Sequence, residues 1–486
     1  MLSSALHALL FIGVSLHALQ RRRNASATIL WIFVAWSIPL FGPLLYLAFG
    51  IDRVSVKGRK RQIDNQRLIH QRDQRHKDDS SFNAWHMDFR TELSAQKNLL
   101  SRNLNMVIDA CNPEHPLLDG NHITPLVSGD EAYPLMLQAI RSAQSHIHLQ
   151  SFIIHYDEVG IKFLDELKAK AEEGVKVRLL FDRFGSTHAY LGGMFRKYHK
   201  TPNFEICGWT QANPFKAQFQ INLRNHRKTM IVDGHIAFFG GVNLANENTT
   251  INGHKAIRDY HFKSEGPLVH ELQLSFLSDW HFMTRQPIDA LLKAELFPRM
   301  LSLGQARARL IDSGPASQPN IISDTFFNAI TMAQSQIQIV TPYFIPPNEI
   351  LKALRSAAQR GVDVQIVVPQ FNNHKYAGLA TEALFEELLT VGVRVFHRKS
   401  PFIHAKAMII DNSIALIGTA NIDVRSLELN YETTVLIEGG ETVDQIKRLV
   451  LEDISESDEL NLNDWLKRPK IQKLGENICA LMTPVL

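Results

Sequence analysis

Two copies of one polar motif constrain this 486-residue chain more than any other feature of its sequence. The first copy, within residues 221–248, contains NHRKTMIVDGHIAFFGGVN, and the second, within residues 399–426, contains IHAKAMIIDNSIALIGTAN. Both follow the pattern His-x-Lys-x4-Asp-x6-Gly-(Gly/Thr)-x-Asn. A five-position match arises by chance at about one start site in a million, so two copies indicate an internal duplication. The motif residues are His226, Lys228, Asp233, Gly240, Gly241 and Asn243 in the first copy and His404, Lys406, Asp411, Gly418, Thr419 and Asn421 in the second.

The duplication extends upstream of the motif. AIRSAQSHIHLQSFII, from Ala139, resembles AITMAQSQIQIVTPYFI, from Ala329, and LKAKAEEGVKVRLLFD resembles LRSAAQRGVDVQIVVPQ. Each stretch predicts a helix, a strand, a second helix that ends at Gly174 or Gly361, and another strand. We therefore expect an α/β fold of two similar halves, residues 116–295 and 296–486, each with a mixed sheet flanked by helices.

The motif residues suit chemistry on a phosphodiester. The apolar residues between Lys and Asp predict a buried strand, and the period of two places His and Lys on one face of the segment leading into it. If the halves pack about a pseudo-two-fold axis, two imidazoles and two ammoniums converge on one cleft. Lysines and the Asn243 and Asn421 amides can then hold phosphate oxygens while one histidine attacks phosphorus and the other protonates the leaving oxygen. The arrangement requires no metal ion or cofactor. A single His-x-Lys would instead be read as a solvated strand end.

The N-terminus is free of charged side chains over two long stretches, Met1–Gln20 and Asn24–Ile51. Each is close to the ~20 residues that cross a bilayer as a helix, so we expect two transmembrane helices within residues 1–51, at about 3–20 and 27–50. A cleaved signal peptide or a buried soluble hairpin are the alternatives. Three arginines lie between the two stretches and five basic residues follow the second, which favours a cytoplasmic catalytic part. Residues 52–115 are predicted to form a juxtamembrane connector with one or two helices, outside the main core.

Overall charge and cysteine content exclude some classes of protein. The net charge is only +3, which argues against a nucleic-acid partner. Three widely spaced cysteines, Cys111, Cys207 and Cys479, provide neither a disulfide framework nor a zinc ribbon and fit a reducing compartment. Histidines outside the motif are interpreted as structural, among them His146, His148, His254 and His261.

The C-terminal stretch is predicted to be an amphipathic helix. Ile471, Leu474, Ile478 and Leu481 recur at helical spacing, downstream of several basic residues. Such a helix can lie on anionic lipid or dock its apolar stripe on the protein core, and the sequence leaves both possibilities open.

The twin motifs resemble those of the phospholipase D superfamily, and the resemblance is closest to bacterial cardiolipin synthases and covers essentially the whole chain. Besides the N-terminal apolar stretches, three short segments support it: TPYFIP at 341–346, RSLELNYE at 425–432 and WLKRP at 465–469. The resemblance implies two phospholipase D-like halves that form one site, with a phosphohistidine formed on His226 and with His404 as general acid and then base. It also implies that one acidic residue downstream of each motif bonds a catalytic histidine, and these match Asp259 and Glu432.

The resemblance leaves two signature positions to be interpreted. Asp233 and Asp411 belong to the catalytic signature, but we expect each to be bonded within its own half. Gly241 departs from the pattern, because the family usually has Ser or Thr there, as at Thr419. With Asn243, Asn421, Asp259 and Glu432, Thr419 is expected to bind the phosphate or support the histidines.

The family implies a cardiolipin synthase of the bacterial inner membrane, a multi-pass enzyme that transfers a phosphatidyl group from one phosphatidylglycerol to another. The alternatives are a membrane-tethered phospholipase D, a transferase that uses another donor or acceptor such as phosphatidylethanolamine, a catalytically idle scaffold and a nuclease.

Overall fold

The computed structural model describes residues 2–20, 25–50, 61, 63–72, 74, 89–95, 98–111, 113–209, 212–213, 218–219, 224–253, 255–314 and 321–481. His254, the arginines at 21–23 and most of the connector lie outside these residues. The chain divides into two units, Met1–Arg59 and Lys60–Leu486.

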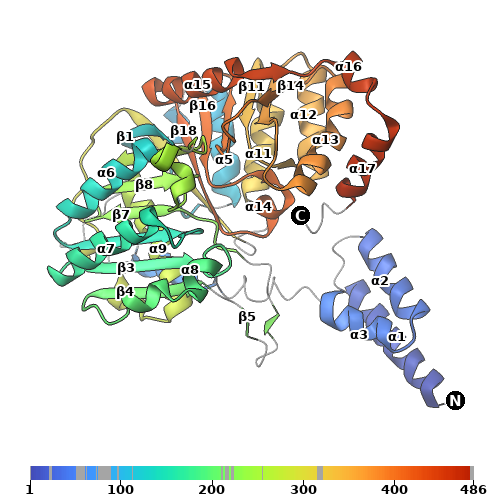
Figure 1. Cartoon of the computed structure of the whole chain (residues 1–486), viewed down its shortest axis with the longest axis horizontal. Coiled ribbons are helices and arrows are strands. Elements are labelled where there is room, and N and C mark those ends of the chain that lie inside the picture. The colour runs from blue at the N-terminus through green and yellow to red at the C-terminus, as the bar shows by residue number, and fades with distance from the viewer. Residues whose placement is uncertain are drawn as a thin grey trace. The chain divides into compact units, whose positions relative to one another are not determined.

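The N-terminal unit consists of short helices (Figure 1). α1 matches the first expected helix, but the second is broken, because residues 38–40 leave the helical conformation and Leu40 has a φ of 62°. Pro39 and Pro43 explain the break, since proline lacks a backbone donor and clashes with the preceding turn. Among the residues described, no helix combines the length and the apolar character that a membrane span requires. The bounds are α1 Leu2–Gln20, α2 Ala25–Ser37, α3 Phe41–Leu45 and the π-helix Tyr46–Gly50.

The large unit is built on one continuous 15-stranded sheet. Its order is β19-β14-β13-β11-β15-β16-β18-β10-β1-β9-β8-β7-β2-β3-β4, and β1 and β10 pair antiparallel at the centre. Reading outward from that pair, the two halves repeat the same arrangement of antiparallel and then parallel strands, with β19 added at one edge. The two predicted sheets are thus joined into one, and the pseudo-two-fold passes between β1 and β10.

The strands of the first half include β1 Leu118–Val127, β2 His146–Ser151, β3 Lys176–Asp182, β4 Phe204–Trp209, β7 Thr229–Val232, β8 Ile236–Gly240 and β9 Tyr260–Glu265. Those of the second half include β10 Ala306–Ser313, β11 Gln336–Val340, β13 Asp363–Pro369, β14 Arg394–Arg398, β15 Ala407–Ile410, β16 Ile414–Gly418, β18 Glu432–Glu438 and β19 Ser457–Glu459. Short pairs form from β5 Ala212–Asn213 with β6 Gln218–Phe219, and from β12 Phe344–Ile345 with β17 Ile422–Asp423.

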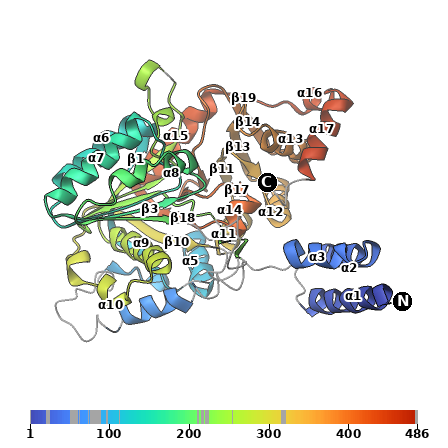
Figure 2. The same cartoon turned by 60° about the horizontal axis from the view of Figure 1, so that its bottom comes forward.

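Helices cover both faces of the sheet (Figure 2). In the first half Met230 and Phe238 pack into the cluster of α6 and α7, whereas Ile231 and Phe239 pack into the cluster of α9. This alternation places α9 on the opposite face, where it shares one core cluster with α15 of the second half. That shared core explains why the halves form a single compact unit. The helices are α6 Ser128–Ser142, α7 Glu158–Glu172, α8 Thr187–Leu191, α9 Leu268–Thr284, α10 Ile288–Leu291, α11 Ile321–Met332, α12 Asn348–Gln359, α13 Lys375–Thr390, α14 Val424–Glu428, α15 Gly440–Ser455, α16 Leu462–Leu466 and α17 Lys470–Ala480.

Local predictions from the repeat agree with the structure. Gly174 and Gly361 follow α7 and α12 with φ values of 101° and 89°, the left-handed conformation that glycine adopts without strain. Part of the connector differs from expectation, because α5, Leu99–Cys111, belongs to the core. Leu104 and Ile108 lie in the same cluster as Ile322 of α11, since apolar residues at intervals of four give α5 one buried face.

Candidate active site

The segment leading into each motif is held by the other half of the chain. The backbone N–H of His226 donates to the carbonyl oxygen of Tyr431 at 2.9 Å, and that of His404 donates to the carbonyl oxygen of Arg258 at 2.7 Å. Tyr431 and Arg258 directly precede Glu432 and Asp259, so the same two backbone contacts bring each carboxylate toward the opposite histidine. The pseudo-two-fold therefore operates at the motif itself.

The side chains repeat this crossed arrangement. Nδ1 of His226 lies 3.0 Å from Oε2 of Glu432, and Nδ1 of His404 lies 2.7 Å from Oδ2 of Asp259. Both carboxylates are fully buried. Because a carboxylate accepts, Nδ1 is the protonated ring nitrogen in each neutral histidine, which leaves a lone pair on Nε2. Each half thus supplies a histidine to one pair and a carboxylate to the other.

The two lysines stand beside their histidines and close enough to influence one another. Nζ of Lys228 donates to the His226 carbonyl oxygen at 2.8 Å, and Nζ of Lys406 donates to the His404 carbonyl oxygen. Burial and then the Lys406 ammonium lower the pKa of Lys228 to about 7. Burial lowers the pKa of Lys406 to about 8 against the pull of Asp259. Two desolvated cations this close are poised to bind an anion.

Burial also lowers the pKa of both motif histidines. For His226 it outweighs the Glu432 carboxylate, which acts in the opposite direction. For His404, burial and then Lys406 lower the pKa to about 4 despite Asp259. A reaction in which one histidine attacks and the other donates a proton needs one imidazole protonated near neutral pH, and the lowered pKa values disfavour this without an additional negative charge. A phosphodiester anion between the histidines supplies it, because a nearby negative charge stabilises imidazolium.

Asp233 and Asp411 do not join the histidines. Asp233 accepts backbone N–H groups of Gln144, Ser145 and His146 at 2.8 Å each, where β2 begins. Asp411 makes the equivalent contacts with residues 334–336, at 2.8–3.0 Å. Each aspartate lies after the buried strand that follows its lysine, β7 or β15, and joins the end of that strand to the neighbouring strand of its own half.

Thr419 and Gly241 occupy equivalent places and act differently. The Thr419 hydroxyl donates to Oε2 of Glu432 at 2.5 Å and accepts the Thr433 N–H at 2.9 Å, so it supports the carboxylate. At Gly241 an added Cβ would lie 2.0 Å from Oδ1 of Asp259. The shorter carboxylate side chain, Asp259, therefore lies against a glycine. The longer one, Glu432, lies against a threonine.

Replacing Gly241 with serine tests this fit. The new Cβ displaces the Asp259 carboxylate, His404 loses its acceptor, and we expect kcat to fall about 10- to 100-fold, as for the loss of a supporting hydrogen bond. The measurement is kcat alongside the thermal unfolding temperature. Gly475→Ala, at a position with open space around the added methyl, is the matched control. Wild-type kcat in Gly241→Ser would contradict the prediction.

The two motif asparagines lie beside the histidines' strands and are largely buried. Oδ1 of Asn243 accepts the Ile153 N–H at 3.2 Å, and Nδ2 of Asn421 donates to Asp423 at 3.1 Å. Burial raises the pKa of the Asp423 carboxyl to about 6. Asp423 was absent from the sequence-based candidates, because an acid two residues after the motif resembles an ordinary helix N-cap, which it also is.

Aromatic rings next to the histidines also escaped sequence reasoning. Phe152 meets the His226 ring edge-on at a centroid distance of 4.9 Å, and Tyr343 meets the His404 ring at 6.3 Å. Both follow the first parallel strand of their half, so the repeat itself was the available signal. Of the other histidines, His146 and His148 bond Gln273 in the core. Within the described ranges, no group of three His, Cys, Asp or Glu side chains is arranged to hold a metal ion.

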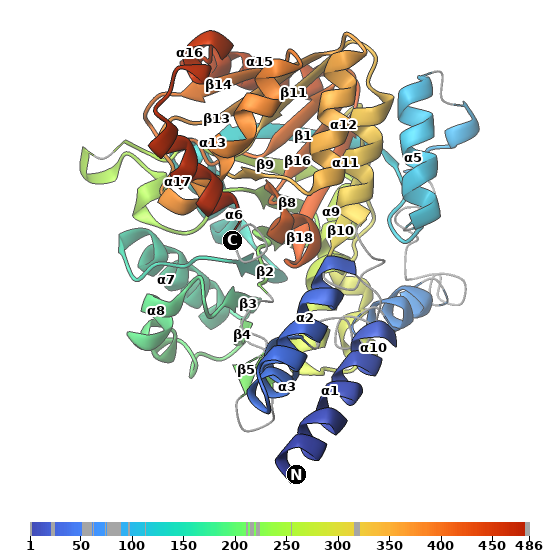
Figure 3. The ribbon, with the colours of Figure 1, turned by 90° about the vertical axis from the view of Figure 1, so that its right-hand side faces the viewer.

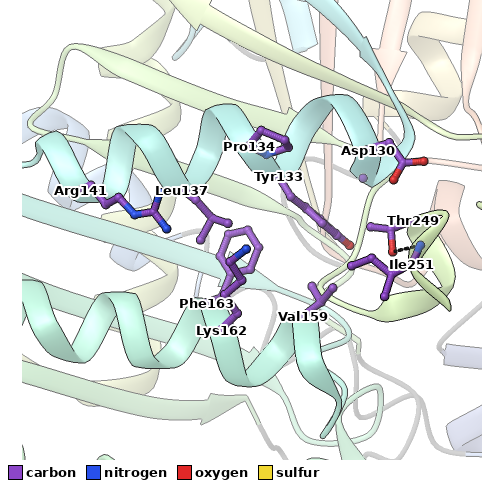
Figure 4. Close-up of a pocket in the computed structure, with 11 residues that line it drawn as sticks. Asp130, Tyr133, Pro134, Leu137, Arg141, Val159, Lys162, Phe163, Thr249 and Ile251 are labelled. Carbon is purple, nitrogen blue, oxygen red and sulfur yellow. Dashed lines mark hydrogen bonds between the residues drawn. The ribbon is translucent and has the colours of Figure 1, made fainter.

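A surface cavity of about 310 Å³ lies apart from these residues, between α6 and α7 (Figure 4). Tyr133, Leu137 and Phe163 give it an apolar wall, and Arg141 and Lys162 stand at one end. Its link to the motif is indirect, through the Tyr133 hydroxyl, which donates to the Asn243 carbonyl oxygen.

Comparisons with known proteins agree with this geometry. Residues 136–280 and 326–454 match the family model described as cardiolipin synthase, PLD-like domain, so each match contains one motif. The chain belongs to the cardiolipin synthase family of phospholipase D-like proteins. Residues 9–50 match the model described as the phospholipase D-nuclease N-terminal region.

Relatives match this family member over nearly its whole length. Cardiolipin synthase 1 of Bacillus anthracis is 33% identical over 98% of this chain and 92% of its own length. Cardiolipin synthase A of Pseudomonas putida (strain W619) is 33% identical over 98% of this chain and 96% of its own length. The crystal structure of phosphatidylserine synthase from Haemophilus influenzae Rd KW20 shares the fold, with a TM-score of 0.62, 17% identity, and coverage of 79% of this chain and all of that one.

Proposed function

We propose that this protein is a cardiolipin synthase that transfers a phosphatidyl group from one phosphatidylglycerol to another, releasing glycerol. The observation that carries the proposal is the crossed pair of His–carboxylate contacts with two buried lysines beside them. Such a site offers two neutral imidazoles with Nε2 available and two cations for one phosphate, which is what exchange of one phosphodiester for another needs.

In the first step Nε2 of His226 attacks phosphorus, and the bond from phosphorus to the glycerol oxygen breaks. Lys228 and Lys406 stabilise the charge that builds on the non-bridging oxygens. His404, protonated while the phosphate anion is bound, gives its proton to the departing oxygen. Glu432 holds the His226 ring in the attacking tautomer and offsets the positive charge that the ring acquires.

In the second step the headgroup hydroxyl of another phosphatidylglycerol attacks the phosphohistidine. His404, now neutral, takes the hydroxyl proton, the P–N bond breaks, and cardiolipin forms while His226 returns to its starting state. One phosphodiester is formed for each that is broken, so the exchange needs no nucleotide energy source. Asp233 and Asp411 hold the motif strands in place, and Thr419, Asn243 and Asn421 support the carboxylates and the substrate phosphate.

The N-terminal residues 1–51 are proposed to anchor the enzyme in the bacterial inner membrane as a multi-pass hairpin. Side chains such as Leu9, Ile29 and Phe41 are about 70% exposed on this unit, which suits contact with lipid better than with water. The larger number of basic residues after the second stretch supports a cytoplasmic catalytic part. The partners are phosphatidylglycerol and membrane phospholipids, not nucleic acid.

Incubation of the purified enzyme with phosphatidylglycerol alone tests the function. Cardiolipin and glycerol in equal amounts are the expected products. Phosphatidic acid as the sole product would establish instead a membrane-tethered phospholipase D, in which water takes the place of the second alcohol. Turnover only after addition of phosphatidylethanolamine would identify a different donor or acceptor.

The low pKa values of the lysines predict an alkaline limit to activity. In the free enzyme Lys228 and Lys406 lose their protons as pH rises through about 7 and about 8, and neutral amines no longer attract the phosphate anion. We therefore expect kcat/KM to fall from about pH 7 upward while kcat falls only at higher pH, because bound phosphate raises both pKa values. Lys228→Arg, which stays charged, should shift the limit upward. A kcat/KM profile that is flat to about pH 10 contradicts the assignment.

A further inference from the structure

The C-terminal helix α17 presents an apolar stripe that the described protein does not cover. Ile471, Leu474, Ile478 and Leu481 are 76%, 54%, 54% and 82% exposed, and they lie at intervals of three and four along one helix face. The sequence left open whether this stripe docks on the core. It does not, because α17 docks through a different face.

The docked face of α17 is fixed by specific contacts with α13, beside which it lies (Figure 3). Cys479 packs into a small cluster with Ile345, Ala377 and Ala380. Lys473 donates to Glu386 of α13 at 2.9 Å. These contacts orient the helix, so the outward direction of the stripe is set by the fold.

The docked face of α17 is linked to the active site through Tyr343. Tyr343 packs against the same cluster that holds Cys479, and its ring meets His404 at 6.3 Å. Phe371 and Tyr376, which are 78% and 65% exposed, follow the parallel strand β13 on this side. Exposed apolar side chains therefore lie both on the C-terminal helix and at the His404 edge of the site.

The first half has an equivalent set of exposed rings near His226. Phe184 follows β3 as Phe371 follows β13, and the guanidinium of Arg224 lies 3.5 Å from the centre of its ring. Tyr190 is covered in the same way by Arg183, at 4.7 Å. Arg224 is two residues from His226, and Asp182 bonds the N–H groups of both Phe184 and Asn225. Aromatic rings and long basic side chains, which combine an apolar body with a polar tip, are both favoured at membrane interfaces.

We propose that the α17 stripe and the aromatic rings on both sides of the histidines form one docking surface for an anionic phospholipid bilayer. This surface, the rim, consists of the α17 stripe with Phe371 and Tyr376 from the second half and of Phe184 and Tyr190 from the first. This proposal rests on the proposed function in one respect, because that function requires headgroup phosphates to reach the histidines. When the rim inserts into the headgroup layer, the headgroup phosphates reach the histidines and no lipid has to be extracted from the bilayer.

Charge and size favour a bilayer over other occupants. Lys467 and Lys470 are exposed beside the stripe, and Arg183 and Arg224 lie in the first-half rim, so cations accompany the apolar groups. An 11-residue helix is too short to cross a bilayer and suits one that lies flat in its surface. The accessible surface area of the four stripe side chains is less than the roughly 800 Å² that each partner buries in a specific protein–protein interface.

Labelling single sites in the full-length enzyme tests the proposal. Cys111, Cys207 and Cys479 are replaced, one cysteine is introduced at Leu474 or Ile478, and the environment-sensitive fluorophore NBD is attached. The enzyme is then reconstituted in vesicles of phosphatidylglycerol and phosphatidylethanolamine. We expect blue-shifted emission that lipids with a shallow doxyl group quench. Lys352→Cys, on the exposed side of α12, is the matched control and is expected to remain quenched by aqueous iodide.

Two outcomes would overturn the proposal. Iodide quenching at 474 and 478 equal to that at 352 would place the stripe in water. Blue-shifted emission without lipid quenching would mean that protein, either the N-terminal helices or a second copy, covers it. These readouts need no turnover, so they are separate from the test of the proposed function.

A second measurement connects docking with catalysis. The double variant Leu474→Ser, Ile478→Ser is assayed with long-chain phosphatidylglycerol in vesicles and with monomeric short-chain phosphatidylglycerol. We expect the ratio of the two rates to fall about 10-fold relative to wild type, and to stay at the wild-type value in Lys352→Ser. An unchanged ratio in the double variant would contradict a role for the stripe in presenting bilayer lipid.

Discussion

Replacing His226 with asparagine lowers kcat for cardiolipin formation by about 10⁴-fold or more, the usual cost of removing a covalent nucleophile. Asparagine keeps a side-chain N–H near the position of Nδ1 and can still donate to Glu432, so the buried carboxylate retains a partner. What disappears is Nε2, the atom that forms the bond to phosphorus. The measurement is cardiolipin release by purified enzyme, with thermal unfolding to confirm that the variant folds.

The matched control is a histidine of the same motif that lies outside the site. His235 is exposed at the turn between β7 and β8, and His235→Asn should retain wild-type kcat. His404→Asn should lose activity to a similar extent as His226→Asn. The double variant should be little worse than either single one, because residues that act as a unit are not additive. Labelled lipid should phosphorylate His226 in wild type, and label that maps to His404 would reverse the two roles.

Local features of the fold were predictable because the sequence encodes them within short stretches. The buried strands β7 and β15 follow from the apolar residues between Lys228 and Asp233 and between Lys406 and Asp411. The helix ends at Gly174 and Gly361 follow from glycine's access to positive φ. The positions of Asp233 and Asp411 beyond those strands follow from strand geometry alone.

Features that depend on how the halves dock were not predictable in the same way. The family resemblance implied that Asp259 and Glu432 bond catalytic histidines, but the sequence of neither half indicates that each carboxylate contacts the histidine of the other half. The fusion of two sheets through β1 and β10 has the same origin, since either strand could have remained an edge. A single sequence contains little information about which distant segments pair.

Electrostatics and exposure depend on packing as well. An ordinary histidine pKa near 6.5 was the reasonable starting value, and burial lowers it at both sites. The α17 stripe has the spacing of a docked helix, and only the contacts of Cys479 show that the opposite face is the docked one. The second N-terminal helix is a case in which the local sequence does contain the reason. Pro39 and Pro43 interrupt the helix that the apolar stretch alone predicts as continuous.

The crossed pairing makes a further large prediction, that Glu432→Gln and Asp259→Asn impair different steps. Glu432 contacts His226, the proposed nucleophile, whereas Asp259 contacts His404, the proposed acid and base. Each amide removes the negative charge that stabilises an imidazolium, and we expect kcat with phosphatidylglycerol to fall about 10³-fold in either variant. With this substrate the two losses look alike, because glycerol departure needs a proton from His404 as well as attack by His226.

Phosphatidyl-p-nitrophenol separates the two steps. The pKa of p-nitrophenol is near neutral pH, so p-nitrophenolate leaves without receiving a proton. Asp259→Asn should then release one equivalent of p-nitrophenol in a rapid burst and stall at the phosphohistidine, since discharge still requires His404 as base. Glu432→Gln should show no burst, since attack by His226 is itself impaired. If the carboxylates served the histidines of their own halves, the behaviour of the two variants would be exchanged. The burst therefore reads out the crossed geometry directly, and it does so in the assembled enzyme, where each motif histidine contacts a carboxylate of the other half.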